Sequence, residues 1–156
     1  MSITAETSRA DSPALIRTAT LADSDQLFAL VEQLGIGDVP RRESFDVAFD
    51  AAVKDSDDHI LLVAEVDNSV VGYALATLAR LLYTNGETAQ LQELVVDSAV
   101  NGSGYGSQLV SAVERECIAR GVTQLTVASI LRAASFYERL DYRSTANYLK
   151  KSFLDE

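Results

Sequence analysis

Hydrophobic positions in the first third of the chain recur at the spacing of helices. Residues 20–23 (Thr-Leu-Ala-Asp) resemble a capping box in which aspartate stands in for the usual glutamate. Apolar residues then recur at helical intervals from 27 to 34, and Gly35 is a suitable C-terminal cap. The same periodicity between residues 45 and 52 predicts a second amphipathic helix.

The rest of the chain is dominated by apolar runs of strand length, bounded by turn residues. Asp-Asn-Ser at 67–69 and Asn-Gly at 85–86 favour tight turns, because Asp and Asn tolerate positive φ. Predicted strands are residues 15–19, 60–66, 70–78, a run ending at Val96, 124–128 and, after a short helix at 132–140, two closing strands at 142–145 and 148–153. This order predicts an α/β (α+β) fold with a mixed, mostly antiparallel central sheet flanked by helices. We expect a loose tail at residues 1–12 and one domain over residues 13–156.

Three glycines follow the strand that ends at Val96, and they precede a helical pattern that Gly121 ends. Gly102, Gly104 and Gly106 occupy every second position, so successive backbone N–H groups can converge on an anion at a helix N-terminus. A P-loop needs Lys followed by Ser or Thr after its last glycine, but Ser107 and Gln108 follow Gly106. A dinucleotide-binding fingerprint that starts at Gly102 needs a glycine at the position of Ser107. A phosphate-binding turn is therefore our interpretation, and a turn that only reverses the chain is the alternative.

Net charge limits the classes of binding partner that we expect, and cysteine content limits the cellular compartment. The chain has 13 basic and 23 acidic residues, a net charge of −10, which argues against nucleic-acid or anionic-membrane surfaces. The excess of acid favours a neutral or cationic partner, or serves solubility alone. Cys117 is the only cysteine, and no apolar run approaches a membrane span, so we expect a cytoplasmic protein without disulfides. The acidic run at 55–59 is typical of a solvated loop, and we expect no metal site.

Two segments resemble the GNAT N-acyltransferases. Residues 94–109 (LVVDSAVNGSGYGSQL) resemble the coenzyme A motif of that family, and residues 136–142 (FYERLDY) resemble its later Phe-Tyr-Glu-x-Leu-Gly-Phe/Tyr segment. The likeness extends in element order over residues 15–153. It implies a GNAT-like domain with a V-shaped splay between two parallel strands, those ending at Val96 and near Ala128.

The resemblance also implies where acetyl-CoA binds. Backbone groups of Leu94 and Val96 would pair with the pantetheine arm, the N–H of Leu94 would polarise the thioester carbonyl, and the turn would hold the pyrophosphate. The residues implied in coenzyme binding are Leu94, Val95, Val96, Asn101, Gly102, Ser103, Gly104, Tyr105, Gly106 and Ser107. Two positions depart from the family pattern. Asn101 replaces a long Arg or Gln side chain, which we expect to weaken binding, and Asp141 replaces a glycine that can adopt positive φ.

Two side chains are candidates for the chemistry. Tyr137 matches the family's tyrosine that protonates the departing sulfur, and packing in the core is the alternative role. Glu93 is the candidate base, and alternation along its strand places it on one face with Leu91 and Val95. An exposed or ion-paired structural role is the alternative for Glu93.

The resemblance predicts transfer of an acetyl group from acetyl-CoA to a primary amine of a small molecule, by direct attack in a ternary complex. Alternatives are a protein N-alpha or lysine acetyltransferase, a non-catalytic acyl-CoA-binding regulatory domain, and a nucleotide-binding module. Partners are acetyl-CoA and an amine acceptor, without nucleic acid, membrane or metal, and a homodimer is possible because family members often dimerise.

Overall fold

The computed structural model describes residues 12–154, so the predicted tail lies outside the described residues except for Ser12. These residues form two compact units, one ending at Thr126 and one beginning at Val127, and each is described by itself below. Within residues 12–154, no helix has both the length and the apolar character needed to cross a membrane.

The first unit is built on a five-stranded sheet in the order β1-β2-β3-β4-β5. β1–β4 pair antiparallel, and β5 lies parallel to β4, so the sheet is mixed as predicted. The strands are β1 (Leu15–Thr18), β2 (His59–Val66), β3 (Ser69–Arg80), β4 (Glu87–Val96) and β5 (Gln124–Val127). The Thr123 N–H donates to the Glu87 carbonyl at 2.9 Å, which holds the start of β5 beside the start of β4.

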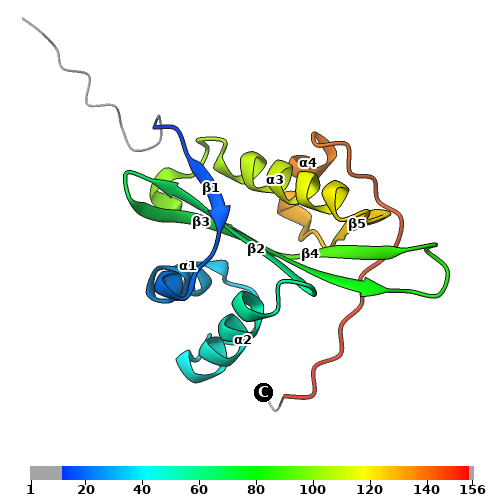
Figure 1. Ribbon diagram of the computed structural model, residues 1–156, viewed down its shortest axis with the longest axis horizontal. Helices are drawn as coiled ribbons and strands as arrows, with labels where there is room; N and C mark the ends of the chain where they lie inside the picture. The colour runs from blue at the N-terminus through cyan, green and yellow to red at the C-terminus, as the bar shows by residue number, and fades with distance from the viewer. Residues whose placement is uncertain (1–11, 155–156) are drawn as a thin grey trace, which may run out of the picture. The chain divides into compact units, whose positions relative to one another are not determined.

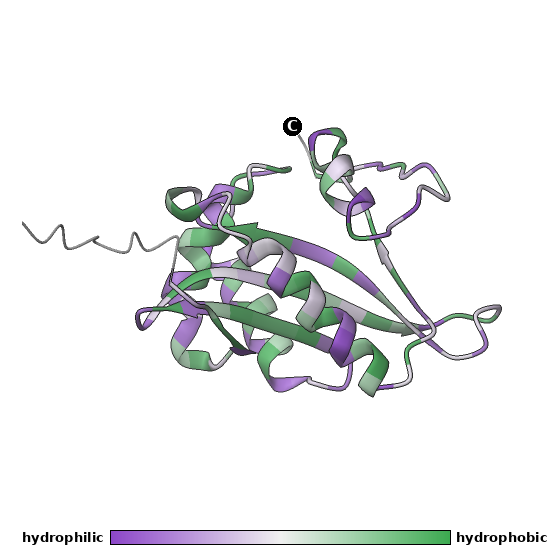
Figure 2. Ribbon diagram, turned by 90° about the horizontal axis from the view of Figure 1, so that it is seen from above, coloured by the Kyte–Doolittle hydropathy of each residue, from purple (hydrophilic) through white to green (hydrophobic). Residues whose placement is uncertain are grey.

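Helices cover both faces of this sheet (Figure 1). α1 (Ser24–Leu34) and α2 (Arg42–Lys54) lie on one face, and α3 (Tyr105–Ala119) lies on the other. Short 3₁₀ turns, η2 (Leu21–Asp23) and η3 (Ser98–Val100), precede α1 and follow β4. The strands are coloured mostly hydrophobic in Figure 2, whereas the helices alternate between hydrophobic and hydrophilic residues, as expected where each helix buries one side.

The turn residues adopt the conformations that the sequence predicts. Asp67 and Asn68 have φ values of 50° and 64°, which suit the two-residue turn between β2 and β3. Gly35 ends α1 in the left-handed region with φ 65°. Cys117 is buried in α3, as its place on the apolar face of that helix predicts.

The residues that share a face of β4 with Glu93 differ in one respect from the prediction. Leu75 pairs with Glu93, but its neighbour Ala76 pairs with Leu91, so Gln92 is an extra residue in the ladder. Directly paired residues share a face and consecutive residues do not, so Leu91 and Glu93 lie on opposite faces of the sheet. Regular alternation therefore placed Leu91 wrongly, because a β-bulge at Gln92 interrupts the period of two.

The second unit contains η4 (Leu131–Ala133) and α4 (Ala134–Glu138), which together match the predicted short helix. The closing strands predicted at 142–145 and 148–153 are wrong, because residues 142–153 contain no strand. A strand needs a partner for its backbone hydrogen bonds, and the described part of this unit has no strand beyond the end of β5. Asp141 adopts φ 69°, the positive φ that a glycine supplies at this position in the family pattern.

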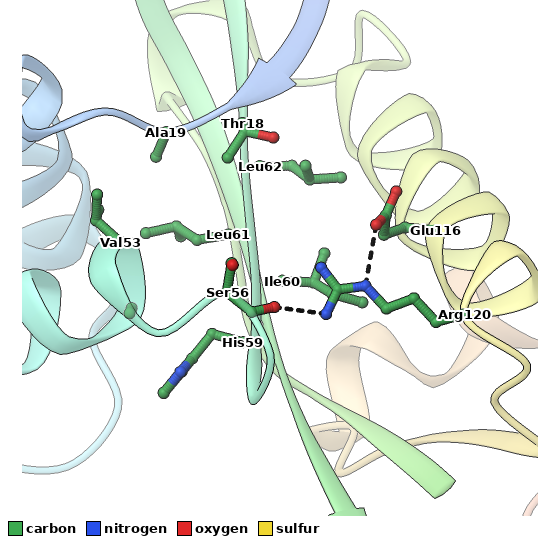
Figure 3. A pocket seen from close by; sticks show the side chains of 11 residues that line it. Thr18, Ala19, Val53, Ser56, His59, Ile60, Leu61, Leu62, Glu116 and Arg120 are labelled. Carbon is green, nitrogen blue, oxygen red and sulfur yellow. Dashed lines mark hydrogen bonds and ion pairs between the residues drawn. The ribbon is translucent and has the colours of Figure 1, made fainter.

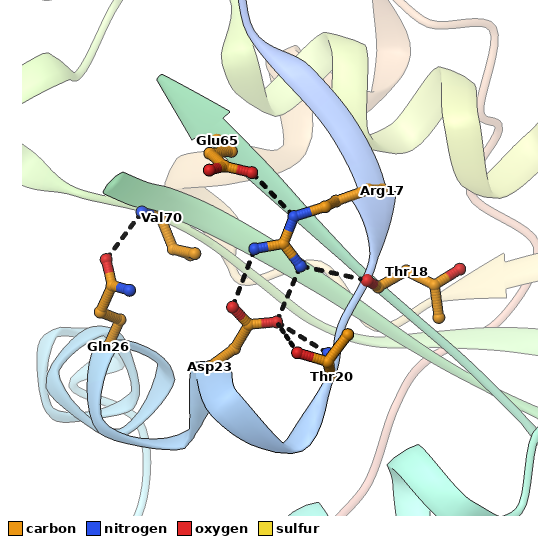
Figure 4. Close-up of polar contacts among 7 residues, drawn as sticks. All are labelled: Arg17, Thr18, Thr20, Asp23, Gln26, Glu65 and Val70. Carbon is orange, nitrogen blue, oxygen red and sulfur yellow. Dashed lines mark hydrogen bonds and ion pairs between the residues drawn. The ribbon is translucent and has the colours of Figure 1, made fainter. Parts of the chain in front are cut away.

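An ion-pair network fixes β1 to the start of α1 (Figure 4). The Arg17 guanidinium contacts the Asp23 carboxylate at 2.8 and 2.9 Å and the Glu65 carboxylate at 2.8 Å. Asp23 is only 4% exposed and also accepts the Thr20 N–H at 2.7 Å, which completes the predicted capping box. The hydrogen bond from Arg17 lowers the pKa of Asp23 below its ordinary value.

We predict that the carboxylate of Asp23 makes the protein sensitive to acid. Because folding lowers the pKa of Asp23, the ionised carboxylate adds to the free energy of unfolding at neutral pH. This contribution is lost as the pH falls below about 4 and the carboxylate is protonated. Asp23→Asn should lower the free energy of unfolding at neutral pH by about 1–3 kcal/mol and flatten its decline in acid. Urea unfolding across this pH range measures both effects. Asp25→Asn is the control, since its side chain is 88% exposed, and equal behaviour of the two variants would contradict the prediction.

Candidate functional site

The end of β4 presents backbone groups to the side of the sheet on which β5 follows. The Asp97 N–H donates to the Val71 carbonyl of β3 at 2.7 Å. Because residues in an antiparallel ladder alternate between facing their partner strand and facing away, Leu94 and Val96 direct their N–H and C=O groups away from β3. These are the two residues whose backbones the sequence implies in pantetheine binding. The predicted splay involves residues of both compact units, and it stays a prediction.

The glycine turn that follows η3 requires glycine for its backbone conformation. Gly102 and Gly104 have φ values of 83° and 87°, and Gly104 is the N-cap of α3. A Cβ atom at either position would meet nothing within 4 Å, so the constraint is φ and not space. The first turn of a 15-residue helix leaves its N–H groups without partners inside that helix. This arrangement is suited to an anion such as a phosphate.

Three of the side chains implied in coenzyme binding are engaged within the fold. The Ser103 hydroxyl donates to the Val100 carbonyl, which stabilises the turn. Tyr105 is 2% exposed, and its hydroxyl donates to the Ser12 carbonyl at 2.5 Å. Val95 packs in the core against the helices on the Glu93 face. A role for these residues in coenzyme binding would therefore use their backbone atoms.

Glu93 is held by a neighbour on the adjacent strand. The Tyr73 hydroxyl donates to Oε1 of Glu93 at 2.7 Å. Tyr73 is 2% exposed, and burial, reinforced by the charge of Glu93, raises its pKa, so the phenol keeps its proton and remains a donor. The carboxylate retains further acceptor sites after this bond. Glu93 is therefore fixed in position while it can still accept a proton or bind an ammonium group.

Tyr73 was not predicted from the sequence, although one signal for it was present. Tyr73 lies in a run of small and aliphatic residues on β3, where a buried tyrosine needs a hydrogen-bond partner. Naming Glu93 as that partner requires the register of β3 against β4, which the bulge at Gln92 alters.

Glu93 and Tyr73 line a cavity of about 260 Å³ between the sheet and the helices α1 and α2. Most of its wall is apolar and includes Val31 of α1 and Phe45 and Phe49 of α2. The volume lies just below the range of about 300–1,000 Å³ that is typical of small-ligand pockets. The cavity suits a small molecule with a substantial apolar surface.

A second cavity, of about 100 Å³, lies where β2 begins, near the ends of α2 and α3 (Figure 3). The one arginine among its lining residues, Arg120, already donates to the Glu116 carboxylate at 3.0 Å and the Ser56 carbonyl at 2.6 Å. These contacts tie the end of α3 to the loop after α2 and leave the guanidinium less able to bind a ligand.

Tyr137, the other candidate for the chemistry, belongs to the second unit. Its ring contacts Phe136 and Tyr142 edge to face, at centroid distances of 5.0 and 5.7 Å. Tyr137 is 8% exposed, and burial raises its pKa, so it carries its proton at neutral pH. It thus meets one requirement of a proton donor, and it also packs within its own unit as the alternative role predicts.

Comparison with known proteins finds a family whose model matches more than half of the chain. The model of the acetyltransferase (GNAT) family matches residues 25–142. The glucosamine 6-phosphate N-acetyltransferase of Arabidopsis thaliana is 24% identical over 142 residues, covering 88% of this chain and 95% of the plant protein.

Solved structures with the same fold include enzymes and a protein described as a regulator. A transcriptional regulator from Bacillus halodurans C-125 has a TM-score of 0.82 at 25% identity, covering 90% of this chain and 100% of its own. An aminoglycoside N-acetyltransferase in complex with CoA has a TM-score of 0.78 at 16% identity, covering 90% of this chain and 95% of its own.

We predict that Tyr73 and Glu93 are energetically coupled. Tyr73→Phe removes a hydrogen bond to a charged acceptor and should lower the free energy of unfolding by about 1–2 kcal/mol. In the Glu93→Ala background the same substitution should cost much less, because the acceptor is gone. A double-mutant cycle by urea unfolding measures the coupling energy. Additive single effects would show that the two side chains do not interact in solution.

Proposed function

Because the chain belongs to the acetyltransferase (GNAT) family, we propose that it transfers an acetyl group from acetyl-CoA to a primary amine of a small molecule. The reaction would proceed by direct attack of the amine on the thioester in a ternary complex. The observation that carries this proposal is the hydrogen bond between Tyr73 and Glu93 on the wall of a cavity. Glu93 lies on β4, the strand whose end leads to the glycine turn.

The coenzyme would be held mainly by backbone groups. The outward direction of Leu94 and Val96 supports hydrogen bonds to the pantetheine amides, and the Leu94 N–H would stabilise the oxyanion of the thioester. The turn from Asn101 to Ser107 would bind the pyrophosphate through N–H groups at the start of α3. Asn101 adds little to this set, since it supplies a short side chain in place of the family's Arg or Gln.

The acceptor amine would enter the cavity and approach Glu93. Glu93 would take the proton that the nitrogen loses as its lone pair forms the C–N bond. The C–S bond then breaks, and Tyr137 would give its proton to the departing thiolate, so that CoA leaves as a thiol. Solvent would return the proton from Glu93 to the tyrosinate.

A small acceptor is favoured by the size of the cavity, whose walls come from the sheet, α1 and α2. Glucosamine 6-phosphate and aminoglycosides, named in the descriptions of related proteins, are amines of this kind and belong in any test. A non-catalytic acyl-CoA-binding domain is the second candidate, because Asn101 departs from the family pattern and one structural relative is described as a transcriptional regulator.

We predict that Glu93→Gln and Tyr137→Phe each lower kcat by about 100-fold or more, because each removes a proton-transfer group. Thiol release from acetyl-CoA, measured across a panel of amines and peptides, gives the rates. Acetyl-CoA binding by both variants should match that of the unchanged protein. Tight acetyl-CoA binding without turnover on any amine would favour the non-catalytic domain. Thermal stabilisation by ATP or NAD and none by CoA would favour a nucleotide-binding module.

We predict that Gly104→Ala weakens acetyl-CoA binding about tenfold. An alanine at φ 87° is strained, and relief of that strain would turn the neighbouring N–H groups away from the phosphates. Gly121→Ala is a matched control, since Gly121 also has positive φ and open space around its Cα. Calorimetric titration with CoA measures both. Equal binding by the two variants would place the pyrophosphate elsewhere.

A further inference from the structure

The charged side chains around the cavity that Glu93 and Tyr73 line indicate what kind of amine it accepts. Among the described residues that line the cavity, Glu93 is the one acidic side chain and Arg41 the one basic side chain. Glu93 lies on β4 beside Tyr73, whereas Arg41 directly precedes α2. The two do not form an ion pair with each other. A ligand can therefore meet one negative and one positive group within the same cavity.

Arg41 differs from its neighbour Arg42 in having no partner among the residues that the structure describes. Arg42 pairs with Asp25 at 2.7 Å and Asp46 at 2.9 Å, and its guanidinium also covers the ring of Phe28. Within residues 12–154, no side chain makes a hydrogen bond or ion pair with the guanidinium of Arg41. Arg42 is thus committed to the fold, while the guanidinium of Arg41 is available to a ligand.

The wall that joins these two charges is apolar. Arg41 is the N-cap of α2, and Ser44, Phe45, Ala48 and Phe49 of that helix follow it along the cavity wall at helical spacing. A guanidinium binds carboxylate or phosphate groups through paired hydrogen bonds. A sugar would bring hydroxyls that this wall gives few partners, and each unpaired hydroxyl would cost binding energy.

We propose that the acceptor is an amphipathic primary amine whose apolar body carries an anionic group, carboxylate or phosphate, and that Arg41 selects it. This inference rests on the proposed function, since it assigns the acceptor of the same site. The amine reaches Glu93 and Tyr73, the apolar body lies on the cavity wall formed by α2, and the anion binds Arg41. Arg41 is then a specificity-determining residue with no part in the proton transfers.

The experiment compares acceptors that differ in one group. 4-(Aminomethyl)benzoate carries the carboxylate, 4-methylbenzylamine replaces it with a methyl group, and glucosamine 6-phosphate keeps an anion without the apolar body. We expect kcat/KM about tenfold higher for the benzoate than for either of the others. Arg41→Ala should lower kcat/KM for the benzoate far more than for 4-methylbenzylamine and so remove that advantage. Arg115→Ala is the control, because this arginine lies on α3 and contacts Ser111.

Calorimetric binding of 4-(aminomethyl)benzoate without acetyl-CoA separates this inference from the proposed reaction. Binding that depends on Arg41 but not on Arg115 upholds the inference even when no amine is acetylated, an outcome that would overturn the proposed function alone. Acetylation with no preference for the benzoate, or an equal loss on all acceptors in Arg41→Ala, overturns the inference and leaves the acetyltransferase standing. A higher rate with glucosamine 6-phosphate than with the benzoate overturns the inference that the acceptor has an apolar body. Absence of both turnover and Arg41-dependent binding overturns the inference and the proposed function together.

Discussion

The arrangement of the candidate site depends on one irregularity in the pairing of β3 with β4. The extra residue Gln92 shifts the ladder, so Leu91 faces the side of the sheet opposite to that of Glu93. Glu93 thereby shares a face with Tyr73 and with the helices α1 and α2, and its carboxylate meets both a buried phenol and the cavity. A β-bulge also increases the local twist of its strand, and here it lies a few residues before the backbone groups that we assign to the coenzyme.

Most elements of the fold followed from periodicity and turn chemistry, because both are properties of neighbouring residues. The helices, the turn at Asp67 and Asn68, the cap at Gly35 and the glycine turn are all of this kind. The bulge at Gln92 is not, since it is defined only by the partner strand. The closing strands failed for a related reason: alternation predicts a strand but cannot supply the neighbour that completes its hydrogen bonds. Tyr73 was missed because its importance depends on that same pairing.

The two halves of the candidate site use different groups, main-chain atoms for the coenzyme and side chains for the acceptor. The implied coenzyme side uses main-chain groups of β4 and the glycine turn, so it requires glycine at Gly102 and Gly104 but few particular side chains. A replacement such as Asn101 is compatible with this design, because the helix N-terminus still supplies N–H groups. The cavity, by contrast, is lined by side chains of α1, α2 and three strands, which sequence change can alter one at a time.

This division explains why the coenzyme was easier to infer than the acceptor. A backbone-built site leaves a signature in glycine spacing, which a single sequence reveals, whereas a site built from side chains on distant elements leaves none. The net charge of −10 favoured a cationic or neutral partner, yet the cavity is lined both by Glu93 and by Arg41, whose guanidinium pairs with no side chain in residues 12–154. Net charge describes the field of the whole surface, and a ligand a few ångströms from a guanidinium responds to that group first. The local pair of opposite charges, joined by an apolar wall, is therefore the better guide to the acceptor.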